Sequence, residues 1–216
     1  MPEGADDLAK RLDGVSDPNT RARLALATIL PRFAARGHEL TVVGGSAIAL
    51  WDPTAHVSHD IDLVGAVLPD ELDDVLTGEL GFERIGRHWL RRDLRLAVEV
   101  PAWVLEPLGA ATASIDGIAV ISLEDLVLDR VEGWHATGAF ESWRQAARLL
   151  GHPLLDPGYL EQRSVSLGLA DVLTVIRDMA AHDAAGSPVD PPLSHAVHSA
   201  FERGGLPAAR RLLRSA

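Results

Sequence analysis

The spacing of apolar residues changes once along the chain. Up to residue 121, short apolar runs typical of β-strands alternate with segments of helical spacing. From residue 122 onward, only the helical spacing is found. This change predicts an α+β fold, with a small mixed sheet and covering helices over residues 1–121 and an all-helical domain over residues 122–216.

Periodicity and breaker residues together place the individual elements. In the first domain we expect helices at 5–13, 19–36, 44–51 and 69–76, and strands at 41–43, 60–64, 82–85, 88–90, 94–100 and 118–121. Pro31 lies inside the second helix and can kink or divide it. Residues 101–116 have no clear pattern. In the second domain we expect helices at 123–136, 139–150, 157–167, 169–182, 192–203 and 206–214.

One strand-like run ends in a glycine-rich turn. The apolar residues 41–43 lead directly into Gly44, Gly45 and Ser46, after which the spacing becomes helical. The first residues of a helix have backbone N–H groups without an intrahelical acceptor, and such groups bind phosphate. The stretch therefore predicts a phosphate-binding turn between a strand and a helix.

Two aspartates stand two residues apart in a later strand-like run. Period-2 alternation aims Asp60 and Asp62 at one face, with Ile61 and Leu63 on the other. Carboxylates side by side repel each other unless a cation lies between them. Hard cations such as Mg²⁺ take oxygen ligands and often bridge to substrate phosphates. The run therefore indicates a divalent-metal site.

Composition is that of an ordinary globular protein. Of the 216 residues, 47% are hydrophobic and 24% are charged. Cysteine is absent, which excludes disulfides and thiolate metal sites. No apolar run approaches the roughly 20 residues that span a bilayer, and the acidic N-terminal segment lacks the apolar core of a signal peptide. We therefore expect a cytoplasmic protein without a membrane partner.

The charge balance narrows the class of partner. A net charge of −11 argues against a protein that binds nucleic acid over its whole surface, but leaves room for a local basic groove. We interpret the arginine groups mainly as solvated helix and strand faces. These groups are Arg21, Arg23, Arg32 and Arg36; Arg84, Arg87, Arg91, Arg92 and Arg95; and Arg203, Arg210, Arg211 and Arg214.

The order of these motifs resembles the nucleotidyltransferase superfamily, which has the polymerase-β-like fold. A strand, Gly-Gly-Ser, a helix, an Asp-x-Asp strand and a later strand with one acid follow one another over residues 41–100. Ser122-Leu123-Glu124-Asp125-Leu126, leading to Arg130, is similar to a pattern in small bacterial members related to the toxins of type IV toxin–antitoxin systems. The resemblance covers roughly residues 35–150.

The resemblance implies roles for three carboxylates. Asp60 and Asp62 would bind the catalytic metals, Mg²⁺ or Mn²⁺. Glu99 would be the third carboxylate, which binds the second metal and helps the acceptor hydroxyl lose its proton. Two metals can stabilise both the attacking and the leaving oxygen of an in-line displacement. The three side chains are therefore the expected catalytic and metal-binding residues.

The resemblance also implies the substrates. Gly44, Gly45 and Ser46 would hold the triphosphate of an NTP, and Arg130 would lie near the nucleotide. The implied reaction moves a nucleoside monophosphate to an acceptor hydroxyl and releases pyrophosphate. The acceptor can be an RNA end, a protein or a small molecule, and a cognate toxin or antitoxin partner is implied as well. The acidic balance favours a small or locally bound acceptor.

Two other enzyme classes share part of the pattern. His56-x-x-His59-Asp60 is similar to the His-Asp doublet of metal-dependent phosphohydrolases, although their doublet lies on a helix. His59 would otherwise lie next to the site or in a loop. A strand, a glycine turn and a later acid also suggest a dinucleotide-binding unit, but Ser46 and Ala49 replace two glycines of its fingerprint.

A non-catalytic member of the family is the third alternative. Relatives often carry basic and acidic residues after the basic helix position, where this chain has Gly133-Trp134-His135 and Phe140-Glu141-Ser142-Trp143. Such a protein would be a binding or antitoxin-like regulatory module. Trp134 and Trp143 would then contribute to an interaction surface, unless they belong to the core.

Overall fold

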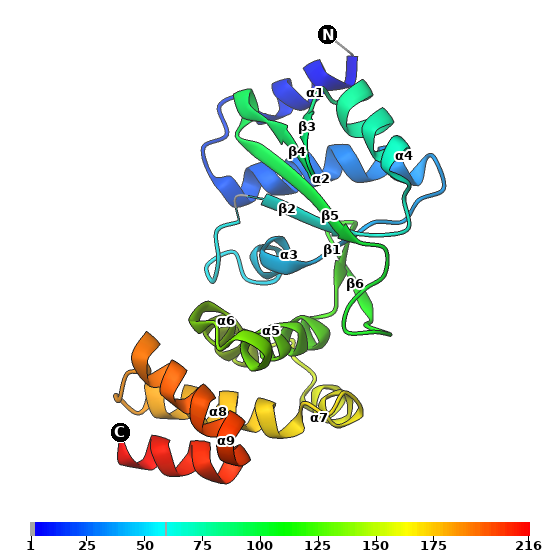
Figure 1. Ribbon diagram of the computed structural model, residues 1–216. Helices are drawn as coiled ribbons and strands as arrows, with labels where there is room; N and C mark the ends of the chain where they lie inside the picture. Colours follow the sequence, from blue (N-terminus) through cyan, green and yellow to red (C-terminus); the bar gives the residue numbers. More distant parts are fainter. Residues whose placement is uncertain (1–2, 59) are drawn as a thin grey trace. The chain divides into compact units, whose positions relative to one another are not determined.

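A computed structural model describes residues 3–58 and 60–216 of the chain (Figure 1). The chain divides into two compact units, with bounds Met1–Ser122 and Leu123–Ala216, of which the described residues are discussed below. The first contains a seven-stranded mixed sheet with helices, and the described part of the second consists of helices and their connections. The α+β class predicted from the sequence, with an all-helical C-terminal region, is confirmed.

The sheet of the first unit places β2 near its centre. Its order, over the described residues, is β3-β4-β5-β2-β1-β7-β6. β2 is parallel to β5 and β1 is parallel to β7, whereas the other neighbours are antiparallel. The strands are β1 (Thr41–Val42), β2 (Asp60–Val64), β3 (Glu83–Ile85), β4 (His88–Arg91), β5 (Leu96–Ala102), β6 (Thr112–Ile115) and β7 (Ile118–Ile121).

The helices of the first unit begin and end close to the predicted positions. They are α1 (Glu3–Leu12), α2 (Pro18–Ala34), α3 (Gly44–Trp51) and α4 (Pro69–Asp73), which continues as the π-helical η1 (Asp74–Glu79), and the short 3₁₀ helix η2 (Arg92–Leu94). α2 continues through Pro31, so the division considered there does not occur. Pro31 lies in the last turn, where the loss of one backbone hydrogen bond interrupts little of the helix.

The helix α2 covers one face of the sheet. Its side chains Leu26, Ile29 and Phe33 are almost completely inaccessible, as are Ile61 and Leu63 of β2. Figure 1 shows α2 crossing behind the strands. Full burial of a side chain of this size contributes about 1.5–3 kcal/mol. This burial fixes which face of β2 points into the core, and so leaves the other face for polar residues.

The second unit has a core of its own. Its helices are α5 (Leu123–Thr137), α6 (Phe140–Leu150), α7 (Pro157–Ser166), α8 (Ala170–Ala184) and α9 (Pro191–Ser215), the last interrupted by non-helical backbone at Gly204 and Gly205. Trp134 is fully buried and donates to Ser194 Oγ at 3.3 Å, and Trp143 is 3% exposed. The suggestion that these tryptophans form an interaction surface is therefore wrong, because both belong to the core.

The segment without a clear sequence pattern contains a hairpin. β5 extends to Ala102, and β6 pairs with β7 across a turn at Asp116 and Gly117. Both turn residues have positive φ, 52° and 79°, as the type I′ hairpin turn requires. Among the described helices, none has the length and apolar character needed to cross a bilayer.

Candidate active site

Strand register brings three carboxylate-bearing residues to one face of the sheet. In the parallel pair of β2 and β5, Asp60 lies opposite Ala97 and Asp62 lies opposite Glu99. Successive side chains of a strand point to opposite faces, so Asp60, Asp62 and Glu99 share a face. The alternate residues Ile61 and Val98 are buried on the other face. Asp62 and Glu99 are thus direct neighbours across the two strands.

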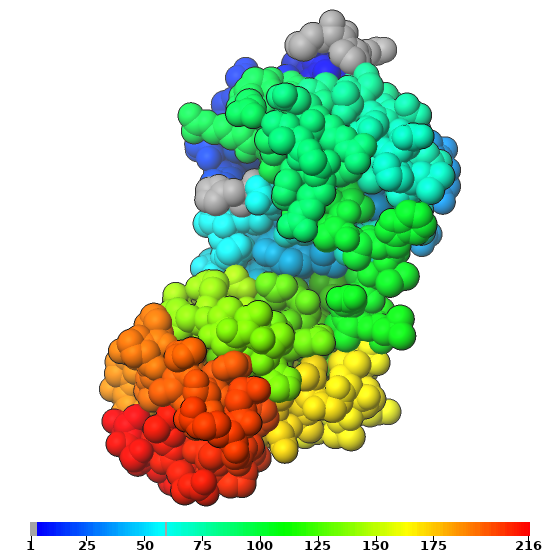
Figure 2. Space-filling view, viewed as in Figure 1, coloured from blue at the N-terminus to red at the C-terminus, as the bar shows by residue number. Residues whose placement is uncertain are grey.

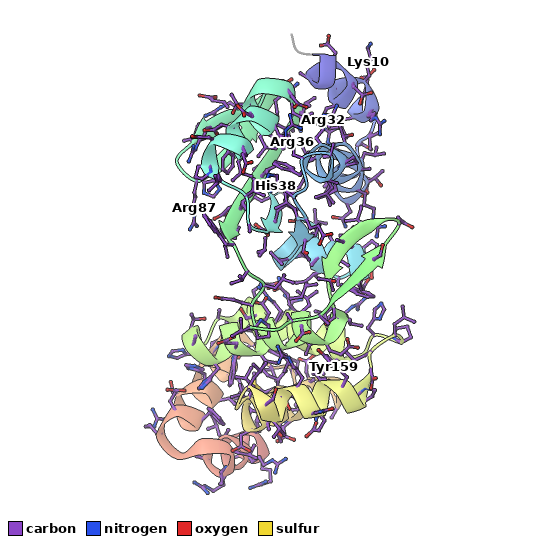
Figure 3. The ribbon with its side chains drawn as sticks, turned by 90° about the vertical axis from the view of Figure 1, so that its right-hand side faces the viewer. Lys10, Arg32, Arg36, His38, Arg87 and Tyr159 are labelled. Atoms are coloured by element: carbon purple, nitrogen blue, oxygen red, sulfur yellow. The ribbon has the colours of Figure 1, made fainter. Side chains whose placement is uncertain are left out.

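Glu99 is paired with two basic residues of the β3–β4 hairpin. Its Oε1 lies 2.8 Å from Arg87 Nε, and its Oε2 lies 3.5 Å from His88 Nδ1. The Glu99 side chain is 14% exposed, whereas that of Arg87 is 74% exposed. Arg87 stands on the turn between β3 and β4 (Figure 3), and this green hairpin contributes to the surface of the first unit in Figure 2. An arginine therefore balances the Glu99 charge.

Gly44 lies against the Asp62 carboxylate. A Cβ at Gly44 would be 2.5 Å from Asp62 Oδ2, and Gly44 has φ +61°, in the left-handed region. The Val43 N–H donates to the Asp62 carbonyl at 3.0 Å, which fixes the turn beside β2. A Cβ at Gly45 would be 2.8 Å from His56 Nε2. At Gly44 the left-handed backbone and the close approach both favour glycine, whereas at Gly45 a side chain would require the His56 ring to move.

The start of α3 has the geometry expected of an anion-binding helix end. The first intrahelical bond runs from the Ala47 N–H to the Val43 carbonyl, so the N–H groups of Gly44, Gly45 and Ser46 precede it. The Ser46 hydroxyl is buried and donates to the Asp60 carbonyl at 2.5 Å. Because that hydroxyl holds β2, the phosphate-binding prediction for Ser46 depends on its backbone N–H alone.

Arg130 belongs to the second unit. It lies on α5, where its guanidinium pairs with the Asp129 carboxylate and donates to Gln145 Oε1 at 3.4 Å. Its nucleotide-binding role stays a prediction.

The donor set at the sheet suits a hard divalent cation. Asp60 is exposed and Asp62 is half-buried, so their carboxylate oxygens can serve as ligands. The close approach of Gly44 leaves room for the Asp62 carboxylate that a side chain would fill. Within residues 3–58 and 60–216, however, no three acidic or histidine side chains are gathered as a ready metal site. Glu99 would have to exchange Arg87 for the metal.

The backbone disfavours both rival enzyme classes. Asp60 begins a strand, whereas the phosphohydrolase doublet requires a helix. His59 lies outside the described residues. β1 is antiparallel to β2, which is not the parallel arrangement of a dinucleotide-binding unit.

Two features of the site were not predicted from the sequence. The first is the pairing of Arg87 with Glu99, since the sequence pattern predicts only a solvated face for the arginine group that contains Arg87. Nothing in the local pattern around Arg87 indicates this pairing, which becomes visible only once β4 is known to place His88 opposite Glu99. The second feature is a pocket beside Asp60, in which Arg95 takes part.

Together, the fold and the site define an α+β protein with an acidic sheet face next to a glycine-lined helix start. No protein-family model matches the chain, and no curated protein matches it. Among solved structures, the chain is similar to the antibiotic-resistance factor ANT(2'')-Ia. The identity is 20% and the TM-score 0.45, over 84% of this chain and 99% of that chain.

Proposed function

We propose that the protein is a metal-dependent nucleotidyltransferase that moves a nucleoside monophosphate from an NTP to an acceptor hydroxyl. The observation that carries the proposal is the pairing of Asp62 with Glu99, with Asp60 on the same face and Gly44 against Asp62. Carboxylates next to a phosphate-binding helix start are the parts that this chemistry needs. The acceptor is an RNA end, a protein or a small molecule.

The three carboxylates would hold Mg²⁺ or Mn²⁺, which offsets negative charge on the phosphates when bound. The backbone N–H groups of Gly44, Gly45 and Ser46 bind and orient the triphosphate. Glu99 takes the proton of the acceptor hydroxyl while the hydroxyl oxygen forms its bond to the α-phosphorus. The bond from the α-phosphorus to the bridging oxygen breaks, and pyrophosphate leaves with its electron pair.

The test compares charge-matched variants in a transfer assay. Each labelled NTP is incubated with Mg²⁺ or Mn²⁺ and with pools of RNA, protein and small hydroxyl acceptors. Asp60→Asn plus Asp62→Asn should abolish transfer. The control, Asp70→Asn plus Asp74→Asn, removes two exposed acids of the same unit and should transfer normally. Transfer that survives the first double substitution would overturn the site.

A binding module without catalysis is the second candidate. It is favoured by the ion pair of Glu99 with Arg87, because Glu99 is then engaged without a metal. A titration with Mn²⁺ separates the two candidates: an enzyme binds the ion through Asp60 and Asp62, and a module of this kind does not. The proposal of a binding module includes a cognate toxin or antitoxin as its partner. Copurification of the chain with the protein encoded by the adjacent gene would test for such a partner.

A further inference from the structure

A pocket of about 460 Å³ lies at the start of β2 and β5, inside the first unit. Its volume falls in the range of small-molecule sites. The polar side chains that line it are Ser16, Arg21, Ser58, Asp60, Asp93 and Arg95. One of the proposed metal ligands, Asp60, therefore also borders this pocket, and Gly44, Gly45 and Asp62 are not among its described lining residues.

Arg21 builds the walls of this pocket. Its guanidinium donates to the carbonyls of Leu12 and Val15 at 3.0 and 2.7 Å, and to the Leu94 carbonyl at 2.5 Å. These bonds tie the α1–α2 connection to the last residue of η2, and they occupy most of the donors of Arg21. The pocket is thus a fixed feature whose two sides are held together by hydrogen bonds.

Arg95, in contrast, has a charge that the described residues leave unused. Its side chain is exposed and lines the pocket, yet it makes no hydrogen bond or ion pair with any described residue. Its backbone is left-handed, with φ 51° and ψ 44°, which is unfavourable for a residue with a side chain. Strained positions of this kind cluster at functional sites. Neither pairing nor packing explains an arginine here.

The acids of the pocket do not cancel this charge. Asp93 accepts from Arg91 Nε and Nη2 at 3.0 and 2.8 Å, so an adjacent guanidinium already balances it. Asp60 is assigned to the metal. The positive charge available to a ligand is therefore that of Arg95, with Arg21 beside it.

We propose that this pocket binds the acceptor, that the acceptor is a phosphorylated sugar, and that Arg95 contacts its phosphate. The inference rests on the proposed function, because Asp60 must face both metal and acceptor. Arg95 and Asp60 line the same pocket, and Arg95 precedes Ala97, the strand partner of Asp60, by two residues, a backbone separation of at most about 7 Å. One phosphorylated sugar can bridge that span, with its phosphate at Arg95 and a hydroxyl at Asp60. The sugar phosphate is either free or the terminal nucleotide of an RNA.

Binding is tested without NTP but with Mg²⁺ present, by calorimetry with ribose 5-phosphate. Arg95→Gln should weaken binding about tenfold, the loss of one charge-assisted contact. The matched control is Arg92→Gln, an exposed neighbour that pairs loosely with Glu83 at 3.7 Å and lies outside the pocket lining. This control should bind like the wild type. Ribose should bind more weakly than its phosphate and should not respond to Arg95→Gln.

A second variant separates binding from folding. Arg95→Gly removes the guanidinium and suits the left-handed backbone, so it should lose affinity while its thermal stability stays equal or rises. A stability loss in Arg95→Gly would mean that Arg95 serves the fold, and would overturn the proposal. Equal effects of Arg95→Gln and Arg92→Gln, or binding of the cationic sugar glucosamine in preference to ribose 5-phosphate, would overturn it as well.

A short single-stranded RNA distinguishes the two sources of the sugar phosphate. Tighter binding of the RNA, with the same dependence on Arg95, indicates a nucleic-acid end, and tighter binding of ribose 5-phosphate indicates a free sugar. Either result supports the pocket. Because this assay involves no transfer, binding with an inactive enzyme would refute the proposed function alone, and transfer unaffected by Arg95→Gln would refute the pocket alone.

Discussion

Replacement of Gly44 by alanine should displace the Asp62 carboxylate. The new Cβ would lie 2.5 Å from Asp62 Oδ2 and 3.1 Å from Asp62 Cγ. Gly44 also has φ +61°, so a side chain meets strain there as well as contact. Gly86→Ala provides a matched control, because Gly86 has φ +64° and a Cβ there would have nothing within 4 Å.

The two variants separate the strain from the contact. The left-handed conformation costs a non-glycine residue roughly 1–2 kcal/mol. Overpacking of a fitted site adds typically about 1–3 kcal/mol. The Asp62 side chain can rotate away and relieve part of the second cost. We therefore expect the free energy of unfolding to fall by about 1 kcal/mol in Gly86→Ala and by about 2–3 kcal/mol in Gly44→Ala, from the same two sources.

Urea denaturation measures the first effect, and Mn²⁺ binding followed by electron paramagnetic resonance measures the second. Gly44→Ala should bind Mn²⁺ at least about tenfold more weakly, since a displaced ligand loses the equivalent of one contact. Gly86→Ala should bind it normally. If the two variants had equal stability and equal affinity, the close approach of Gly44 to Asp62 would have no consequence for the site, and the reasoning would fail.

Three further predictions concern residues outside the site. Hydrogen bonds from the Thr20 hydroxyl and, to a smaller extent, from the Thr20 N–H lower the pKa of Asp17. The ionised Asp17 therefore stabilises the fold above its ordinary pKa of 3.8, and this stabilisation is lost as the pH falls through the lower pKa of the folded state. Asp17→Asn should make the free energy of unfolding less dependent on pH in this acid range, and an unchanged dependence would contradict the prediction. Burial and, to a smaller extent, the negative charge of Asp125 raise the pKa of Tyr159 above its ordinary 10.0. Ultraviolet titration of Tyr159, the single tyrosine of the chain (Figure 3), should therefore give a lower pKa in Asp125→Asn than in the wild type. Asp125→Ala should lower the free energy of unfolding, measured by urea denaturation, by about 3–5 kcal/mol. The reason is that Arg163, whose Nε lies 3.1 Å from Asp125 Oδ1, would lose its buried partner. A decrease of less than about 1 kcal/mol would refute the prediction.

The sequence predicts which side chains of β2 and of β5 share a face, because successive side chains of a strand point to opposite faces. Alternation put Asp60 and Asp62 opposite Ile61 and Leu63, and the burial of the apolar pair agrees with it. Whether β2 and β5 are neighbours is a different matter. The pairing of Asp62 with Glu99 depends on a long crossover between the two strands, whose register no local pattern specifies.

Other features have no local signal at all. β6 is an edge strand of alternating exposed and half-exposed residues, so it lacks the apolar alternation that marks a buried face. Arg95 adopts a left-handed backbone conformation, which a glycine at that position would have indicated and an arginine does not. The roles of Ser46 and Arg87 depend on long-range contacts to Asp60 and Glu99. The sequence therefore did not predict one edge strand, the backbone conformation of Arg95 and the tertiary pairing of polar side chains.

The pairing of Glu99 bears most directly on the choice between an enzyme and a binding module. Arg87 is largely exposed, and an ion pair with such a residue contributes at most about 1 kcal/mol. Asp62 and Glu99 are held side by side by strand register, so their mutual repulsion is built into the sheet. A divalent cation between the two carboxylates would interact favourably with both charges at once. The weak partner is therefore the replaceable one, and the arrangement of the strands favours the metal over Arg87.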